Sequence, residues 1–99
     1  MRFIINEKVY DTDKMELIGR VRKWYAANDW FTIRMLGEGY GKYFDCMLYR
    51  SQKDNYLLTH ESSTGTTVGE VITESDAKAL LRQYDYDAYV KIYGELEEA

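Results

Sequence analysis

Basic residues interleaved with aromatic ones form the stretch of this sequence whose residue types could support binding chemistry. The basic members are Arg20, Arg22, Lys23 and Arg34, and the aromatic members are Trp24, Tyr25, Trp30 and Phe31. Lysine and arginine neutralise phosphates, and aromatic rings stack on unpaired bases. The stretch therefore indicates contact with single-stranded nucleic acid, with the alternative that its aromatic rings build the hydrophobic core.

Charge is divided unevenly between the two halves of the chain. Residues 1–53 carry ten Lys/Arg and seven Asp/Glu, a net charge of +3, whereas residues 54–99 carry three and ten, a net charge of −7. The acidic half suggests the opposite kind of binding, in which a carboxylate surface imitates nucleic acid and occupies a basic groove. Its candidate residues are Asp85, Asp87 and Glu95. The alternative is that both halves mix in the folded surface.

Catalytic and metal-binding patterns are incomplete. The glycines of residues 37–42 (GEGYGK) lack P-loop spacing, and Tyr follows the Lys where Ser or Thr is required. His60 is the only histidine, and on a strand it points away from Glu61. Cys46 is the only cysteine, and the adjacent Asp45 should raise its thiol pKa rather than activate it. One His and one Cys cannot form a His/Cys zinc site within one chain. We therefore expect no enzyme activity, metal, cofactor or small-molecule substrate.

Length and composition indicate one domain covering residues 1–99. A single cysteine forms no internal disulfide, which fits a reducing cytoplasm. No apolar run approaches the roughly 20 residues of a membrane span, and the opening residues lack the apolar core of a signal peptide. We expect a cytoplasmic protein without a membrane partner, and the oligomeric state is left open.

Turn chemistry predicts most of the strands. A polar turn at residues 51–55 separates two strand-forming runs at 43–51 and 56–61, which is typical of a β-hairpin. Asn6 tolerates a left-handed backbone and predicts a tight turn between two short N-terminal strands. Residues 30–36 are predicted to form a strand, 37–41 a loop, and 69–72 the last strand.

Residues 13–26 fit both a helix and a strand. Their apolar positions follow helical spacing, but Gly19 costs a helix about 1 kcal/mol relative to Ala. Asp13 and Glu16 have capping-box spacing. The pattern alone favours a helix from about residue 13 to residue 26.

The C-terminal part has the clearest helix signals. Thr73 is an N-cap candidate, Asp85 can cap a second short helix, and Gly94 ends it. The apolar residues expected to be buried are Leu80, Leu81, Tyr84, Tyr89 and Ile92. The predicted fold class is α+β: an antiparallel sheet of four to six strands with one face covered by the C-terminal helices.

Several segments resemble small proteins from phages and mobile elements of Firmicutes. These segments are IINEKVYDTDKMELIG, LYRSQKDNYLLTHES, VITESDAKALL and YDYDAYVKIYGELEE. The chain departs from the group where Glu7 replaces a turn Gly, Asp54 and Asn55 replace a hairpin Gly, and Tyr93 replaces a Phe. Residues 20–45 match the group poorly.

The resemblance implies a function. Some proteins of this kind are anti-CRISPR proteins that act on type II-A Cas9. The resemblance implies that this chain is a non-catalytic Cas9 inhibitor in the bacterial host, with Cas9 or its guide RNA as its partner. The alternative is a nucleic-acid-binding accessory protein of a mobile genetic element. The resemblance also implies that the helix after Thr12 is short and gives way to a strand near Gly19. Since Gly19 disfavours a continuous helix, we favour a short helix at 13–18 followed by a strand through about Tyr25.

Overall fold

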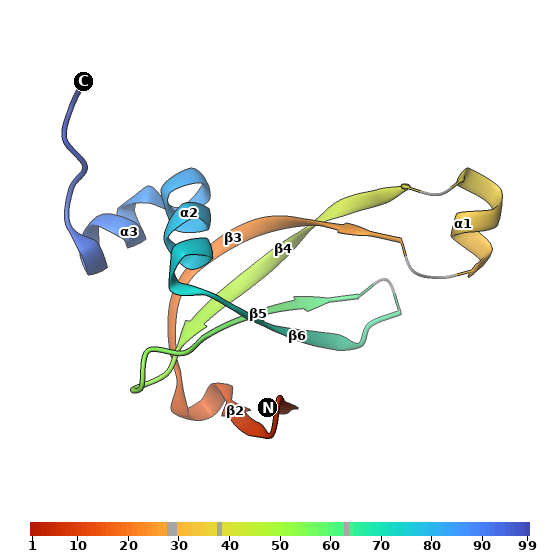
Figure 1. The fold of residues 1–99 in the computed structure, drawn as a ribbon, viewed down its shortest axis with the longest axis horizontal. Coiled ribbons are helices and arrows are strands. Elements are labelled where there is room, and N and C mark those ends of the chain that lie inside the picture. The colour runs from red at the N-terminus through yellow and green to blue at the C-terminus, as the bar shows by residue number, and fades with distance from the viewer. Residues whose placement is uncertain (28–29, 38, 63) are drawn as a thin grey trace.

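A four-stranded antiparallel sheet with helices on one face forms the body of this protein in the computed structural model (Figure 1). The structure describes residues 1–27, 30–37, 39–62 and 64–99. The elements in chain order are β1 (Arg2–Ile5), β2 (Lys8–Asp11), a 3-10 turn (Thr12–Lys14), β3 (Glu16–Ala26), α1 (Trp30–Leu36), β4 (Gly41–Arg50), β5 (Tyr56–Glu61), β6 (Thr67–Ile72), α2 (Glu74–Tyr84) and α3 (Tyr86–Tyr93). The α+β prediction is confirmed.

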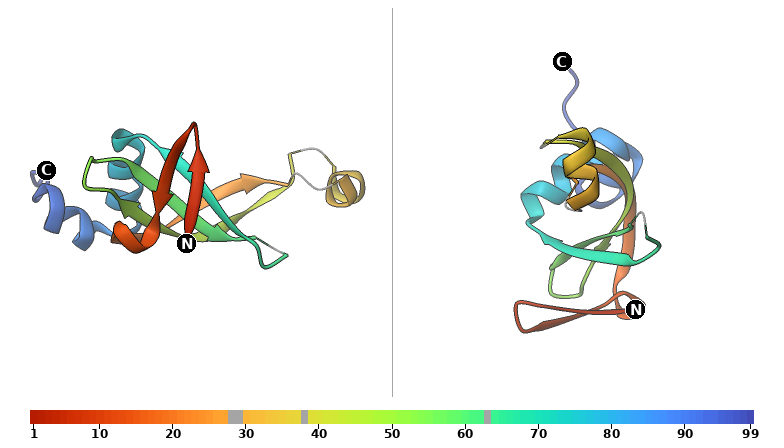
Figure 2. Two further views of the ribbon diagram at one scale, coloured as in Figure 1. Left: turned by 90° about the horizontal axis from the view of Figure 1, so that it is seen from below. Right: turned by 90° about the vertical axis from the view of Figure 1, so that its right-hand side faces the viewer.

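The N-terminal strands β1 and β2 form a separate two-stranded sheet. Asn6 and Glu7 join them with φ angles of 53° and 63°, the left-handed pair that a two-residue hairpin turn requires. Phe3 lies against Gly69 of β6, where an added Cβ would come within 2.7 Å of the Phe3 ring. The small sheet therefore packs on the face of the large sheet that the C-terminal helices do not cover (Figure 2).

The large sheet has the strand order β3-β4-β5-β6, and every neighbouring pair is antiparallel. The predicted hairpin of β4 and β5 is confirmed, with Leu48 opposite Leu58. The predicted strand near Gly19 is also confirmed, and the register shifts between Leu17 and Gly19. A side chain at Gly19 would collide with Leu81, so glycine permits the close approach of α2 to β3.

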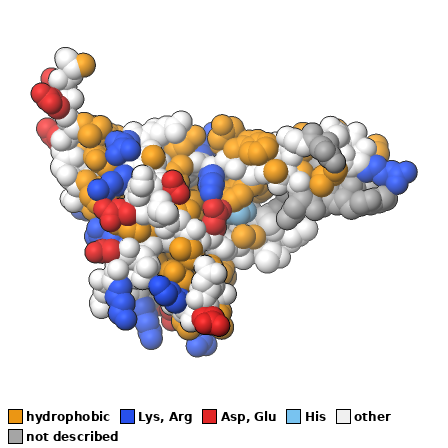
Figure 3. Space-filling view, in the orientation of Figure 1, with side chains coloured by type: hydrophobic (Ala, Val, Ile, Leu, Met, Phe, Trp, Pro, Cys, Tyr) orange, Lys and Arg blue, Asp and Glu red, His pale blue; other side chains and the backbone are white. Residues whose placement is uncertain are grey.

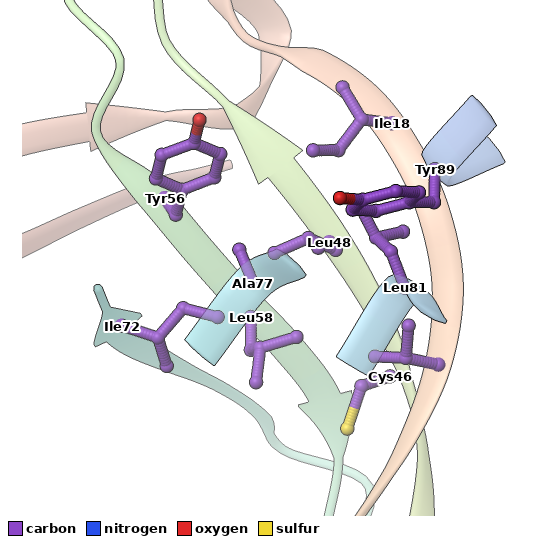
Figure 4. Packing of buried hydrophobic residues seen from close by; sticks show 10 residues of the cluster. Ile18, Cys46, Leu48, Tyr56, Leu58, Ile72, Ala77, Leu81 and Tyr89 are labelled. Carbon is purple, nitrogen blue, oxygen red and sulfur yellow. The ribbon is translucent and has the colours of Figure 1, made fainter. Parts of the chain in front are cut away.

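The main core lies between the sheet and the helices (Figure 4). Its buried members are Ile18, Val21, Cys46, Leu48, Tyr56, Leu58, Ile72, Ala77, Leu81 and Tyr89. Of the residues predicted to be buried, Leu81 and Tyr89 are buried, and Leu80 and Ile92 are half-buried against the cluster. The prediction was wrong for Tyr84, which is 37% exposed because it lies in the last turn of α2.

Residues 30–36 are an α-helix, so the predicted strand there was wrong. This segment lies at the tip of the β3–β4 ribbon, where no other strand of the described residues lies beside it (Figure 1). A helix satisfies its backbone groups internally, which an unpaired strand cannot do. Gly37, with φ 90°, donates its N–H to the Ile33 carbonyl and ends the helix.

Side-chain caps set the ends of the other helical segments. Thr73 Oγ1 accepts from the Asp76 N–H at 3.1 Å, and Gly94 lies at the end of α3, as predicted. The helix expected at 13–18 is only a 3-10 turn. Its cap is Asp11, which accepts from the Asp13 N–H at 3.1 Å, and Glu16 already belongs to β3. The capping-box prediction was therefore wrong, because the chain returns to extended geometry at Met15.

Candidate binding surface

The ribbon formed by β3 and β4 extends beyond the rest of the sheet. β3 and β4 pair as far as Ala26 and Gly41, whereas β5 pairs with only the last four residues of β4, Met47–Arg50. The β3–β4 and β5–β6 ribbons consequently separate from one another (Figure 1). We call residues 20–26 and 41–47, with α1 at their tip, the arm.

A group of side chains bridges the arm and the β5–β6 ribbon. The Lys23 ammonium forms an ion pair with Glu70 of β6, across the whole width of the sheet. The His60 ring stacks on Tyr25 with centroids 4.4 Å apart and lies 4.8 Å from the Phe44 ring. Both aromatic rings belong to the arm, so His60 fixes the base of the arm to β5.

Burial controls the titration of this bridge. Burial raises the pKa of the Tyr25 hydroxyl and lowers the pKa of His60. The nearby Lys23 ammonium also lowers the pKa of His60. Burial alone would raise the pKa of Glu70, but the combined hydrogen bonding and charge of its neighbours, led by Lys23, outweigh burial and lower that pKa. His60 is therefore favoured in its neutral form and Glu70 in its charged form.

The same bridge contains the sole cysteine. Burial raises the pKa of the Cys46 thiol, which donates to the Phe44 carbonyl at 3.4 Å. The pKa is raised, as the sequence predicted, but the main cause is burial and not the neighbouring Asp45. The Asp45 carboxylate is exposed and forms an ion pair with Arg22. Within the described residues, the Tyr25 hydroxyl and His60 Nδ1 are buried without a hydrogen bond of normal geometry. The thiol is held in its unreactive protonated form.

The opposite face of the arm is exposed and carries aromatic and charged side chains. Strand alternation places Arg22 and Trp24 on this face, opposite Asp45 and Tyr43 respectively. The Arg22 guanidinium is 3.3 Å from the Asp45 carboxylate and 5.6 Å from the centre of the Tyr43 ring. Trp24 is 42% and Tyr43 is 54% exposed. The outer face of the arm, defined by these four residues with Arg20 and Met47, is the candidate binding surface.

The four predicted basic residues do not form one cluster. Arg20 and Arg22 share the outer face, but Lys23 points to the helix side and pairs with Glu70. Arg34 is an exposed residue in the last turn of α1, at the tip of the arm. The structure thus keeps Arg20 and Arg22 together and assigns Lys23 to the bridge.

The acidic candidates lie at the other end of the molecule. Asp85 caps α3, and Asp87 is exposed in its first turn. Glu95 is exposed in the C-terminal tail, where Figure 3 shows carboxylates extending from the body. Asp85 is committed to backbone hydrogen bonds, so of the three candidates Asp87 and Glu95 are the two that present carboxylates to a partner.

Sequence reasoning missed Tyr43 and Glu70. The alternation of residues 41–47 could have placed Tyr43 on the face of Asp45. The sequence has no comparable signal for Glu70, since its contact with Lys23 depends on the curvature of the sheet.

Comparisons of the chain with protein-family models, curated proteins and solved structures found no match. Among the described residues, no helix has the length and apolar character needed to cross a membrane.

Proposed function

We propose that this chain is a non-catalytic inhibitor of a Cas9-type CRISPR nuclease and acts by binding Cas9 or its guide RNA. The outer face of the arm is the surface that docks. The proposal combines the resemblance of the terminal and central segments to phage proteins with the exposure of this surface.

The exposure of Trp24 and Tyr43 is the observation that carries the proposal. The two rings are cross-strand neighbours on a part of the sheet that neither the helices nor the N-terminal strands cover. Aromatic residues and arginine are the side chains enriched at the energetic centres of binding interfaces. Next to them, Arg22 supplies a cation suited to phosphate or carboxylate.

The charge of the whole chain favours Cas9 or its guide RNA over free duplex DNA. The net charge is −4, and a polyanionic duplex is repelled by an acidic protein unless a strong basic patch offsets it. A ribonucleoprotein offers both basic protein surface and accessible RNA, so it accommodates the basic arm and the acidic tail together.

Inhibition of Cas9 cleavage by variants of the arm tests the proposal. The double variant Trp24→Ala/Tyr43→Ala removes both exposed rings, and we expect inhibition to weaken by tenfold or more, as for loss of an interface centre. The control Tyr84→Ala/Leu96→Ala removes two exposed apolar side chains from the other end and should inhibit normally. If the natural chain neither binds Cas9 with guide RNA nor slows its cleavage, the proposal fails.

The second candidate is a nucleic-acid-binding accessory protein of a mobile genetic element. The proximity of the Arg22 guanidinium to the Tyr43 ring favours it, because such pairs bind single strands by stacking and charge. Binding to RNA or single-stranded DNA that Trp24→Ala/Tyr43→Ala weakens, in a chain that has no effect on Cas9, would select this function.

A further inference from the structure

A cleft lies between the N-terminal sheet and the β4–β5 turn. It has a volume of about 880 Å³. The residues that line it are Arg2, Lys8, Val9, Tyr10, Asp11, Lys14, Met15, Ser51, Gln52, Lys53 and Asn55. Figures 1 and 2 place the N-terminal sheet and this turn away from α1, so the cleft is separate from the tip of the arm.

The cleft is basic although the chain is acidic. Four of its lining residues are Lys or Arg and one is Asp, which gives a lining charge of +3 in a chain of net charge −4. The cationic members, all exposed, are Arg2, Lys8, Lys14 and Lys53. Within the described part of the chain, no carboxylate lies within ion-pair distance of these four side chains.

The carboxylates near the cleft are already engaged or lie beside it. Asp11 accepts from the Asp13 N–H and is 3.9 Å from the N-terminal ammonium. Glu16 pairs with Arg50 at 3.6 Å in the neighbouring hollow, which Asp54 also lines. Among the described residues, the four cations of the cleft therefore take part in no ion pair, and the carboxylates of Asp13, Glu16 and Asp54 line the adjoining hollow.

Ordered turns hold two of these lysines in place. Ser51 Oγ accepts from the Lys53 N–H at 3.3 Å and from the Asn55 N–H at 3.0 Å. Lys14 is the last residue of the 3-10 turn that Asp11 caps. Fixed backbone positions reduce the entropy lost when a ligand is bound.

We infer that this cleft binds the phosphodiester backbone of single-stranded nucleic acid. Lysine acts as a point charge that meets phosphate oxygens from many directions, and three of the four cations are lysines. Tyr10, the only aromatic residue of the lining, is 6% exposed and offers no face for stacking. Binding in the cleft therefore reads the backbone and tolerates any base sequence.

An acidic peptide suits the cleft less well. Lysine and arginine pair with carboxylate as well as with phosphate, so the choice between the two ligands rests on how their charges are spaced. A strand of nucleic acid presents regularly spaced charges that can meet cations from β1, β2, the 3-10 turn and the β4–β5 turn. This inference stands apart from the proposed function, because the cleft contains none of the arm residues on which that function rests and is tested by separate variants.

Fluorescence anisotropy with short poly(U) and poly(A) RNA strands tests the inference. The whole protein should bind both strands with similar affinity. Four phosphate contacts predict a slope of about −3 in log affinity against log salt, which is roughly a 50-fold loss between about 50 and 200 mM. Lys8→Glu/Lys53→Glu should lower affinity by tenfold or more. Two lost phosphate contacts should also make the slope shallower, about −1.4 or closer to zero.

The matched control is Arg82→Glu/Lys91→Glu, which changes the net charge equally at exposed positions of α2 and α3. It should keep most of the affinity. Thermal unfolding must show that both double variants are folded. Equal losses in the two variants would mean general charge repulsion and would overturn the inference, as would binding of polyglutamate in place of RNA or a strong preference for one base sequence.

Discussion

The Asp85 carboxylate joins the start of α3 to the edge of β3. Its Oδ1 accepts from the Ala88 N–H at 3.3 Å, and its Oδ2 accepts from the Arg20 N–H at 3.2 Å. One side chain thus caps a helix and satisfies a backbone donor of the edge strand at the base of the arm. The two sets of residues that the sequence offered as alternative binding sites meet here, through the backbone of Arg20.

Replacing Asp85 should destabilise the fold. Asp85→Ala removes the cap and the hydrogen bond to Arg20, so we expect the free energy of unfolding to fall by about 2–4 kcal/mol. Asp85→Asn keeps a single acceptor oxygen and should lose about half as much. Chemical denaturation measures both values. Asp87→Ala is the control and should cost less than about 1 kcal/mol, because Asp87 is an exposed residue in the first turn of α3. An unchanged stability of Asp85→Ala would contradict the joint role.

Leu81 should be the most costly residue of α2 to truncate. Its side chain is fully buried between α2 and β3, next to Gly19. Leu81→Ala should lower the free energy of unfolding by about 2–5 kcal/mol, because a cavity remains in the core. Tyr84→Ala, at the exposed end of the same helix, should cost far less. A loss below about 0.5 kcal/mol for Leu81→Ala would remove α2 from the core.

The local parts of this fold were predictable because their signals lie in neighbouring residues. Asn6, Thr73, Asp85 and Gly94 mark turn and helix ends through their own backbone geometry or short-range hydrogen bonds. The helix at 30–36 was not predictable, because its residues suit a helix and a strand equally. Its position at the tip of the β3–β4 ribbon, where the described residues offer no strand to pair with, favours the helix. The positions of the binding residues depend on strand register, which sent Lys23 and Arg22 to opposite faces.

Contacts between residues far apart in the sequence explain why the remaining features could not be predicted. Lys23 and Glu70 are 47 residues apart, and only the curvature of a four-stranded sheet brings its two edge strands together. The basic cleft likewise combines the N-terminal sheet with the β4–β5 turn. Its lysines are scattered in sequence and have no shared motif.

Acidification should weaken the bridge at the base of the arm, beginning with His60. Its pKa is lowered in the folded protein, so the unfolded chain binds the proton more readily. The contribution of neutral His60 to the free energy of unfolding is fully present above the pKa of His60 in the unfolded chain, about 6.5. This contribution is lost as pH falls toward the lower pKa of His60 in the folded protein. Thermal melts between about pH 8 and 5 should show a falling Tm. His60→Phe preserves stacking on Tyr25 and should remove the decline in that interval, whereas an identical decline in the variant would exclude His60.

Glu70 should act at lower pH. Its folded pKa lies below the usual value, so its pairing with Lys23 stabilises the fold above the unfolded pKa of about 4.5 and is lost as pH falls through the folded pKa. Glu70→Gln should therefore be less stable than the natural chain at neutral pH, and the difference should shrink below about pH 4. The control Glu61→Gln changes an exposed residue of β5 and should show no such convergence. A stability difference that does not depend on pH would mean that the charge of Glu70 is not the cause.

Charge reversal on the arm and on the tail should decide how the chain meets Cas9. If the outer face of the arm contacts guide RNA, Arg20→Glu/Arg22→Glu should weaken inhibition and RNA binding together. If the acidic end enters a basic groove of Cas9, Asp87→Lys/Glu95→Lys should weaken inhibition without lowering the affinity for free RNA. Asp85 is left unchanged in both sets, because its loss would unfold the α3 junction.

Arg22 also pairs with Asp45, so Arg22→Glu/Asp45→Arg restores that ion pair in reverse. Recovery of inhibition in this swapped variant would show that Arg22 acts through the local pair, whereas continued loss shows that the partner requires a cation at position 22. Inhibition that survives both reversal sets would contradict an electrostatic docking surface at either end.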